Sequence, residues 1–310
     1  MASSHTTVTL EDLAAPTHRR VRENTVRTLL FVAALVSVLI SALILWSLFR
    51  EAWTFIAGVD WGVTWGEIGW YPRRGIYDVP TLLVSSLITT AIAMLVAAPI
   101  GLGAAIYLSE YATPNVRKWL KPTIEVLAGI PSVVIGYFAL LWIAPEVVAR
   151  IGGPQSGSLM AAGIGVGILT IPLVTSISED AMRSVPRELR EASAGLGARK
   201  VATTTKVVLP AAVSGLVAAL IVAVSRAIGE TMVVFLAGGA TDAALFASSP
   251  FDSGLTMTAA MASLASGTDS VVGAGLTFQS LYFVGLMLFV ITLGLNLIGD
   301  AFVRRVREAY

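Results

Sequence analysis

Six long apolar runs constrain what this chain can fold into more than any other feature. Each is long enough to cross the roughly 30 Å hydrocarbon core of a bilayer, which takes about 20 residues of helix. In lipid every backbone N–H and C=O group must be paired within the protein, so runs of this length are expected to be helices. The sequence therefore predicts an all-α, polytopic membrane protein with about six transmembrane helices, at 28–49, 80–108, 122–143, 158–178, 211–239 and 278–303.

Composition supports the membrane class and excludes several kinds of chemistry. Hydrophobic residues make up 55% of the chain and charged residues 13%, with a mean hydropathy of +0.79, whereas about 25% of a soluble domain is charged. The chain has no cysteine, and its two histidines, His5 and His18, precede the first apolar run. Disulfides, thiolate metal sites and a histidine site within the membrane are therefore excluded, and we expect no cofactor and no metal.

Motifs for catalysis and for nucleotide hydrolysis are also missing from the sequence. No G-x-x-x-x-G-K-S/T phosphate loop occurs, so the chain is not expected to hydrolyse ATP itself. No set of side chains has the pattern of a catalytic centre, which argues against an intramembrane enzyme. The net charge of +1 gives no electrostatic reason to expect a nucleic-acid partner.

The distribution of basic residues predicts the orientation. If the N-terminus is cytosolic, sixteen of the 21 Lys and Arg residues fall in cytosolic segments and four fall outside, with Arg226 inside a span. This bias predicts that both termini are cytosolic. We divide the chain into a cytosolic tail (1–27), the first transmembrane helix with its outer loop (28–79), a core of five helices (80–303) and a cytosolic C-terminal tail (304–310). The sequence leaves open whether the outer segment 240–277 holds a short re-entrant or interfacial helix.

The cytosolic loop 179–210 carries the strongest local pattern. From Pro186 onward the sequence predicts a short amphipathic helix, because proline suits the first turn and Glu188 lies near the positive end of the dipole. Leu189 and Leu196 are the apolar anchors of one face, which also carries Ala192 and Ser193. Glycines at 195 and 197 then weaken and end it. Such a helix either inserts into a groove of another protein or lies on the membrane surface as a connection, and the residues alone do not decide.

The motif E-A-S-x-x-x-G, followed by L-P at 209–210, resembles the EAA loop of ABC importer permeases. The resemblance implies a type I ABC importer permease fold, in which this loop docks into a cytosolic ATPase. The residues it assigns to ATPase coupling are Leu189, Glu191, Ala192, Ser193, Leu196 and Gly197.

Three further segments resemble phosphate importer permeases of the PstC/PstA family, and PstC more than PstA. They are YLSEYA at 107–112, LKPTIEVLAGIPSVVIGYFAL at 120–140 and SRAIGETM at 225–232. The resemblance runs from about Pro80 to the end. It implies half of a translocation pore for inorganic phosphate in the bacterial inner membrane. The implied partners are a second homologous permease forming a heterodimer, two copies of a cytosolic ATPase, and an external phosphate-binding protein.

Four charged side chains fall within the expected spans, and we single out three of them, Glu125, Arg226 and Glu230; the fourth, Asp300, lies near the end of the last span. A charge at the bilayer centre costs at least about 2.5–3.5 kcal/mol, so each should face the bundle interior or water. Arg226 and Glu230 are four residues apart and would share a helix face, where they can pair. Such a pair either locks the helix to its neighbours or orients Arg226 toward an anion. With the SRAIGETM resemblance we favour the second reading, with all three residues on the substrate pathway.

Other interpretations remain at this point. A permease for another oxyanion, such as sulfate or molybdate, would share most of these features. An ion-coupled secondary transporter would need no ATPase. Small residues at Gly163, Gly165 and Gly167 are expected to permit close helix packing and are assigned no chemistry.

Overall fold

The computed structural model describes residues 17–62, 64–66, 68–239, 244–266 and 275–307, without the side chains of 17–22, 306 and 307. The chain divides into two compact units, Met1–Arg50 and Glu51–Tyr310, and each is described by itself.

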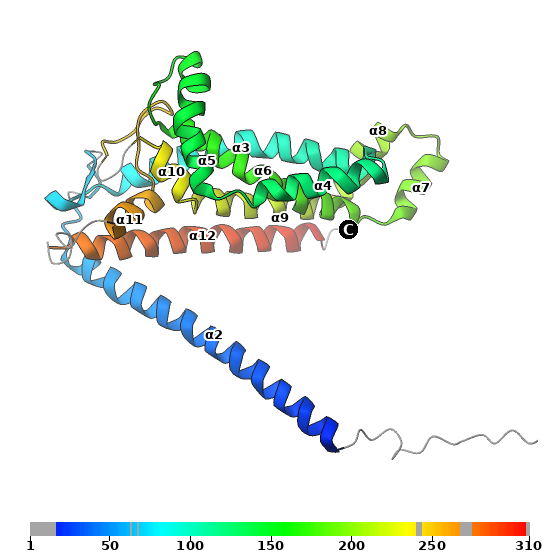
Figure 1. The fold of residues 1–310 in the computed structure, drawn as a ribbon, viewed down its shortest axis with the longest axis horizontal. Helices are drawn as coiled ribbons and strands as arrows, with labels where there is room; N and C mark the ends of the chain where they lie inside the picture. The colour runs from blue at the N-terminus through cyan, green and yellow to red at the C-terminus, as the bar shows by residue number, and fades with distance from the viewer. Residues whose placement is uncertain (1–16, 63, 67, 240–243, 267–274, 308–310) are drawn as a thin grey trace, which may run out of the picture. The chain divides into compact units, whose positions relative to one another are not determined.

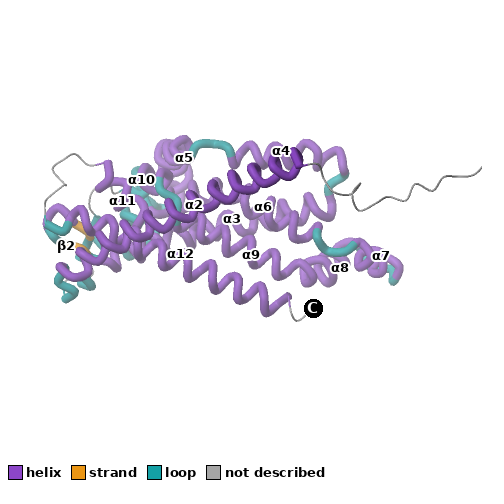
Figure 2. The backbone as a smooth tube through the Cα atoms, turned by 90° about the horizontal axis from the view of Figure 1, so that it is seen from below, coloured by secondary structure: helices purple, strands orange, loops and turns teal. Residues whose placement is uncertain are grey.

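Helices make up nearly all of the regular structure in the described residues, as expected for an all-α protein (Figures 1 and 2). The α-helices are α2 (Thr17–Gly58), α3 (Val79–Ile106), α4 (Pro114–Ala128), α5 (Ser132–Phe138), α6 (Leu159–Arg183), α7 (Arg187–Gly195), α8 (Lys200–Thr203), α9 (Leu209–Ile228), α10 (Met232–Ala237), α11 (Met257–Ser266) and α12 (Thr277–Arg307). Three π-helical segments continue α3, α5 and α8: η2 (Tyr107–Tyr111), η3 (Ala139–Val148) and η5 (Thr204–Val208). Short 3-10 turns are η1 (Pro72–Arg74) and η4 (Ala149–Ile151), and a two-stranded ribbon pairs β1 (Trp70–Tyr71) with β2 (Ile76–Tyr77).

Six helical segments in the described residues are long and apolar enough to cross a membrane, which confirms the expected number. They are Glu23–Gly58, Val79–Tyr111, Ser132–Ile151, Leu159–Arg183, Lys200–Ile228 and Thr277–Arg305. The most apolar window of the first has no buried residue, and that of the fourth is 61% buried. The fourth segment therefore forms the centre of the second unit.

The second unit is a bundle in which α6 packs against α3 and α9, while α9 also packs along α12 (Figure 1). Small residues on α6 allow the close approach. A Cβ atom placed on Gly163 would lie 2.6 Å from Ile92 Cβ, and one on Gly167 would lie 2.8 Å from Val96 Cβ. On Gly165 it would lie 2.9 Å from a methyl carbon of Val233. The packing role expected for these three glycines is confirmed.

The third span differs from its expected range of 122–143. Helix α4 ends at Ala128, and the chain turns before α5 begins at Ser132 (Figure 2). Pro131 causes the break, because it has no N–H to donate and disfavours helical backbone at the residue before it. The membrane-length apolar segment begins only after this break, at Ser132. Helix α4 is instead amphipathic, contains no buried residue and packs against α6.

The fifth span is also interrupted, where a continuous run over 211–239 was expected. Helix α9 ends at Ile228, and α10 starts at Met232 after a turn in which Glu230 N–H donates to the Ala227 carbonyl at 3.2 Å. Helix α10 packs against α5, so the two half-helices that follow the two breaks are neighbours. A Cβ atom on Gly136 of α5 would lie 3.1 Å from the carbonyl oxygen of Met232.

The two ends of the bundle carry different structures. Helices α7 and α8 lie at one end, and α10 and α11 lie at the other (Figure 1). Helix α11 is a ten-residue apolar helix within the segment 240–277, so this segment does hold a short helix. The ribbon is joined to the same segment, since Trp70 N–H donates to the Ala244 carbonyl at 2.8 Å.

Adding one methyl group at the α3–α6 contact should destabilise the bundle. We expect Gly163→Ala to lower stability by about 1–3 kcal/mol, because its Cβ overlaps Ile92 and the packed backbone must shift. The measurement is the midpoint of thermal unfolding of the detergent-purified chain. Gly103→Ala is the matched control, since a Cβ there meets nothing within 4 Å. Equal midpoints for both variants would contradict the close-packing interpretation.

Candidate functional site

Helix α7 has clear start and stop signals in its own sequence. Pro186 precedes its first residue, Arg187, as the sequence predicts. At the other end Gly197 adopts φ +75°, a left-handed conformation that favours glycine. Gly197 N–H donates to the Ala194 carbonyl at 2.9 Å, and Ala198 N–H donates to the Ser193 carbonyl at 3.1 Å. This pair of bonds is the Schellman motif, which satisfies carbonyls that the helix end leaves free.

The apolar anchors of α7 are exposed in this chain. No residue of α7 is buried, and the side chains of Leu189 and Leu196 are 44% and 89% exposed. The helix projects beyond the ends of α6 and α9 (Figure 1). An apolar face of this kind is suited to insertion into a groove on another protein.

Arg190 fastens α7 to the bundle. Its Nη2 atom donates to Glu110 Oε1 of η2 at 2.9 Å and to the Met182 carbonyl of α6 at 2.8 Å. Its Nη1 atom donates to the Val185 carbonyl at 2.6 Å. Sequence reasoning missed this residue, because no spacing rule pairs Arg190 with an acid 80 positions earlier. The resemblance to YLSEYA had marked Glu110 without giving it a partner.

A weaker contact joins α7 to α8, and another joins α8 to η2. Ser193 Oγ lies 2.8 Å from Thr203 Oγ1 of α8. The Lys200 ammonium lies 5.1 Å from the ring centroid of Tyr111, a cation–π contact. Ser193 therefore lies on the attached side of α7, while Leu189 and Leu196 are the freely presented residues.

The expected ion pair between Arg226 and Glu230 does not form. Arg226 lies in the last turn of α9, but the helix ends at Ile228, so Glu230 does not continue its face. No ion pair within 4.0 Å joins the two side chains. Arg226 is exposed and Glu230 half-buried. The Glu230 carbonyl accepts a hydrogen bond from Thr258 Oγ1 of α11 at 2.7 Å. This hydrogen bond fixes the backbone at Glu230. The Arg226 and Glu230 side chains form no ion pair with any of the described residues.

Glu125 does not lie in a membrane-length helix. It is on α4, before the break at 129–131, and lines a hollow together with Arg117, Lys118, Lys121 and other residues. The expectation that it belongs to the third span was wrong, because Pro131 ends the helix before that span begins.

A buried carboxylate that the sequence analysis did not single out joins α4 to α6. Glu179 is 0% exposed and pairs with Arg117 of α4. Lys121 Nζ lies 3.1 Å from Glu179 Oε2, and Arg183 Nη1 lies 3.9 Å from Oε1. Burial and the charge of Arg183 lower the pKa of Arg117, and Asp180 opposes this effect. The expected fourth span ended one residue before Glu179, where hydropathy falls, so periodicity gave no reason to consider it.

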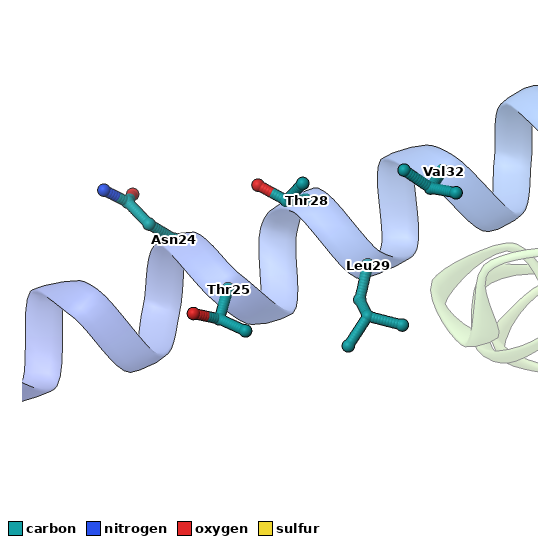
Figure 3. A pocket seen from close by; sticks show the side chains of 5 residues that line it. All are labelled: Asn24, Thr25, Thr28, Leu29 and Val32. Carbon is teal, nitrogen blue, oxygen red and sulfur yellow. The ribbon is translucent and has the colours of Figure 1, made fainter.

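A separate hollow lies along the first helix. Figure 3 shows it lined by Asn24, Thr25, Thr28, Leu29 and Val32, all from α2. No charged side chain is among these five, and one helix surface does not enclose a ligand. We assign it no function.

Comparison with known proteins identifies the family. Residues 97–308 match the family model described as binding-protein-dependent transport system inner membrane component. The chain belongs to this family. Its members are transport subunits, and the matched range includes α7 and both helix breaks.

Relatives of this inner membrane component include transport permeases from several bacteria. The chain is 31% identical to the phosphate transport system permease protein PstC 1 of Mycobacterium tuberculosis over 280 residues, covering 81% of this chain and 82% of that one. It is 32% identical to PstA 1 of the same species over 222 residues, covering 71% and 70%. A probable ABC transporter permease, YqgH of Bacillus subtilis, is 36% identical over 66% of this chain and 63% of its own length. The resemblance to the PstC/PstA family is confirmed.

Solved structures confirm the fold class of this inner membrane component. A bacterial ABC transporter that imports alginate matches 92% of this chain with a TM-score of 0.62 and 14% identity. The methionine ABC transporter MetNI matches 73% of it with a TM-score of 0.53 and 19% identity. The chain is therefore a multi-pass membrane protein with the fold of type I ABC importer permeases.

Breaking the Arg190 attachment should loosen α7. We expect Arg190→Ala to lower stability by roughly 1–3 kcal/mol, because it leaves the largely buried Glu110 carboxylate without its cation. Thermal unfolding in detergent measures the effect. Arg199→Ala removes an exposed arginine with no ion pair among the described residues, and should leave the midpoint unchanged. If the two variants unfold alike, Arg190 does not fasten α7.

Proposed function

We propose that this chain is the transmembrane permease subunit of an ATP-driven importer of inorganic phosphate, forming half of the pore. The observation that carries the proposal is α7, an amphipathic helix fastened to α6 and η2 with its apolar face uncovered. It supports an ATP-driven mechanism, because an exposed apolar helix is suited to docking with another subunit. The chain has no phosphate loop, so in such an importer the ATPase is a separate subunit. The PstC and PstA relatives favour phosphate as the substrate.

In this proposal α7 is the coupling helix for a cytosolic ATPase dimer. Leu189 and Leu196 insert into a groove of the ATPase, and Glu191 and Ala192 complete the contact surface. Gly197 permits the sharp exit from the helix, while Ser193 holds α7 to α8. A displacement of the ATPase then moves α7, and the Arg190 contacts carry the movement to η2 and α6.

The proposed substrate pathway includes Arg226, Glu230 and Glu125. A guanidinium group presents a fork of donors that matches phosphate oxygens. Arg226 has no ion pair among the described residues, so its donors are available to an anion. Glu230 lies at the break after α9, and transporters often bind substrate beside interrupted helices. A carboxylate on the same pathway would weaken anion binding and favour release. Glu125 then belongs to the cytosolic mouth of the pathway.

The remaining partners follow from the same proposal. The excess of basic residues at the α7 end supports a cytosolic location for that end and for both termini. A second homologous permease completes the pore as a heterodimer in the bacterial inner membrane, and an external phosphate-binding protein delivers the substrate. A permease for sulfate or molybdate is the nearest alternative, and an ion-coupled secondary transporter is a more distant one.

A charge on the exposed face of α7 should prevent ATPase docking. We expect Leu196→Asp to reduce co-purification of the ATPase at least tenfold, because the carboxylate would have to be desolvated in an apolar groove. The control is Leu245→Asp, the same change at a residue that is 67% exposed and lies outside α7. Undiminished co-purification of the Leu196 variant would rule out α7 as the coupling helix and favour a surface-lying connection.

Neutralising Arg226 should stop transport without dismantling the complex. We expect Arg226→Gln to abolish phosphate uptake in cells that have no other high-affinity phosphate importer, while the ATPase still co-purifies. Glu230→Gln should alter uptake without loss of assembly. Uptake that survives in the Arg226 variant would remove this residue from the pathway. Competition by sulfate or molybdate in the wild type would favour the alternative oxyanion.

A further inference from the structure

Two adjoining hollows lie where α4, α6 and α7 come together. One, of about 590 Å³, is lined by residues of α4, its preceding loop, α6 and α7. The other, of about 420 Å³, lies between η2, α4, α6, α7 and α8. Three arginines line both hollows: Arg117 of α4, Arg183 of α6 and Arg187 of α7. We call these three residues the arginine cluster.

The charges around the cluster are not balanced. The larger hollow is lined by five cations and one acid, Glu125, and the smaller by five cations and two acids, Glu110 and Glu191. Glu179 pairs with Arg117 of α4, and Asp180 pairs with Lys121 of α4, which neutralises part of this positive charge. Counting these five acids against the seven different cations that line the two hollows leaves a surplus of two positive charges.

The surplus lies on the side chains that face the hollows without a partner. Arg187 and Lys118 form no ion pair with any described residue, and both are exposed. Arg183 reaches Glu179 only at 3.9 Å, beyond hydrogen-bonding distance. Two guanidinium groups with free donors, those of Arg183 and Arg187, therefore line a hollow that is large enough for a small oxyanion.

We propose that the arginine cluster binds a phosphate group, supplied either by free inorganic phosphate or by a phospholipid headgroup. Arginine is suited to this ligand, because its donors bind two phosphate oxygens at once. The proposal rests on the proposed function in one respect. It takes the cluster to lie on the cytosolic side of the membrane, where the importer releases phosphate. Of the proposed pathway residues, Arg226 and Glu230 line neither hollow, whereas Glu125 lines the larger one.

Occupation of the cluster has a mechanical consequence. A ligand bridging Arg183 and Arg187 would join the first residue of α7 to the end of α6, and Arg117 would add α4 to the same contact. It would thus restrain the helix that the ATPase has to move. If the ligand is free phosphate, its binding here would slow the transport cycle as cytosolic phosphate rises.

The test uses the intact importer complex in nanodiscs of neutral phosphatidylcholine, without the external binding protein. Binding of ³²P-labelled inorganic phosphate is measured by equilibrium dialysis, and ATPase content is measured on the same samples. We expect Arg187→Gln to weaken binding about tenfold, since it removes a charge-assisted pair of donors. Lys206→Gln, which removes an exposed cation of η5 that lines neither hollow, should bind as the wild type does.

Further outcomes separate the two ligand sources and the rival explanations. If the wild type binds no free phosphate, but native mass spectrometry shows phospholipid adducts that Arg187→Gln loses and Lys206→Gln keeps, the ligand is a headgroup and the proposal stands. If Arg226→Gln abolishes phosphate binding and Arg187→Gln does not, phosphate binds only in the pore. That result overturns the proposal and keeps the proposed function. If Arg187→Gln instead loses the ATPase, the cluster is part of the docking surface and the proposal is overturned. Absence of both phosphate and phospholipid binding overturns it as well.

Discussion

Pairing of backbone groups in a medium without water is the constraint on which this fold depends. It makes continuous helices the default, so each interruption must be sheltered by protein or open to a water-filled cavity. The described chain interrupts two helical segments, at 129–131 and 229–231, and the half-helices after them pack together. Gly136 allows the contact, because any larger residue would meet the Met232 carbonyl and Leu236. The half-helices that follow the two interruptions, α5 and α10, therefore form a single contact in the bundle.

Much of the architecture could be predicted, because membrane spans are encoded by hydropathy alone. The number of spans, the amphipathic helix after Pro186 and its ending at Gly197 follow from local rules of length, periodicity and backbone conformation. The glycines of α6 were correctly read as packing positions. Each of these inferences uses residues that are near one another in sequence.

The errors in the third and fifth spans arose because hydropathy carries no information about where the backbone breaks a helix. A window average does not register that Pro131 ends one helix and that Ser132 begins another, nor that α9 stops before Glu230. The pairing of Arg226 with Glu230 was inferred from helical spacing and failed with the helix. Glu179 and Arg190 were missed for a different reason. Their partners are 62 and 80 positions away, and only the tertiary fold brings them together.

The contacts of α7 lead to the least regular turns of the bundle. Glu110, the partner of Arg190, belongs to the π-helical segment η2, and Thr203, the partner of Ser193, immediately precedes the π-helical segment η5. A π turn contains one residue more than an α turn and is less stable, so it can revert locally to α geometry or migrate along the helix. Because one residue of an α-helix corresponds to about 100° of rotation, such a change would turn side chains about the helix axis. In the proposed coupling, a pull on α7 would therefore twist α3 and α9 about their axes, with little tilting of the helices themselves.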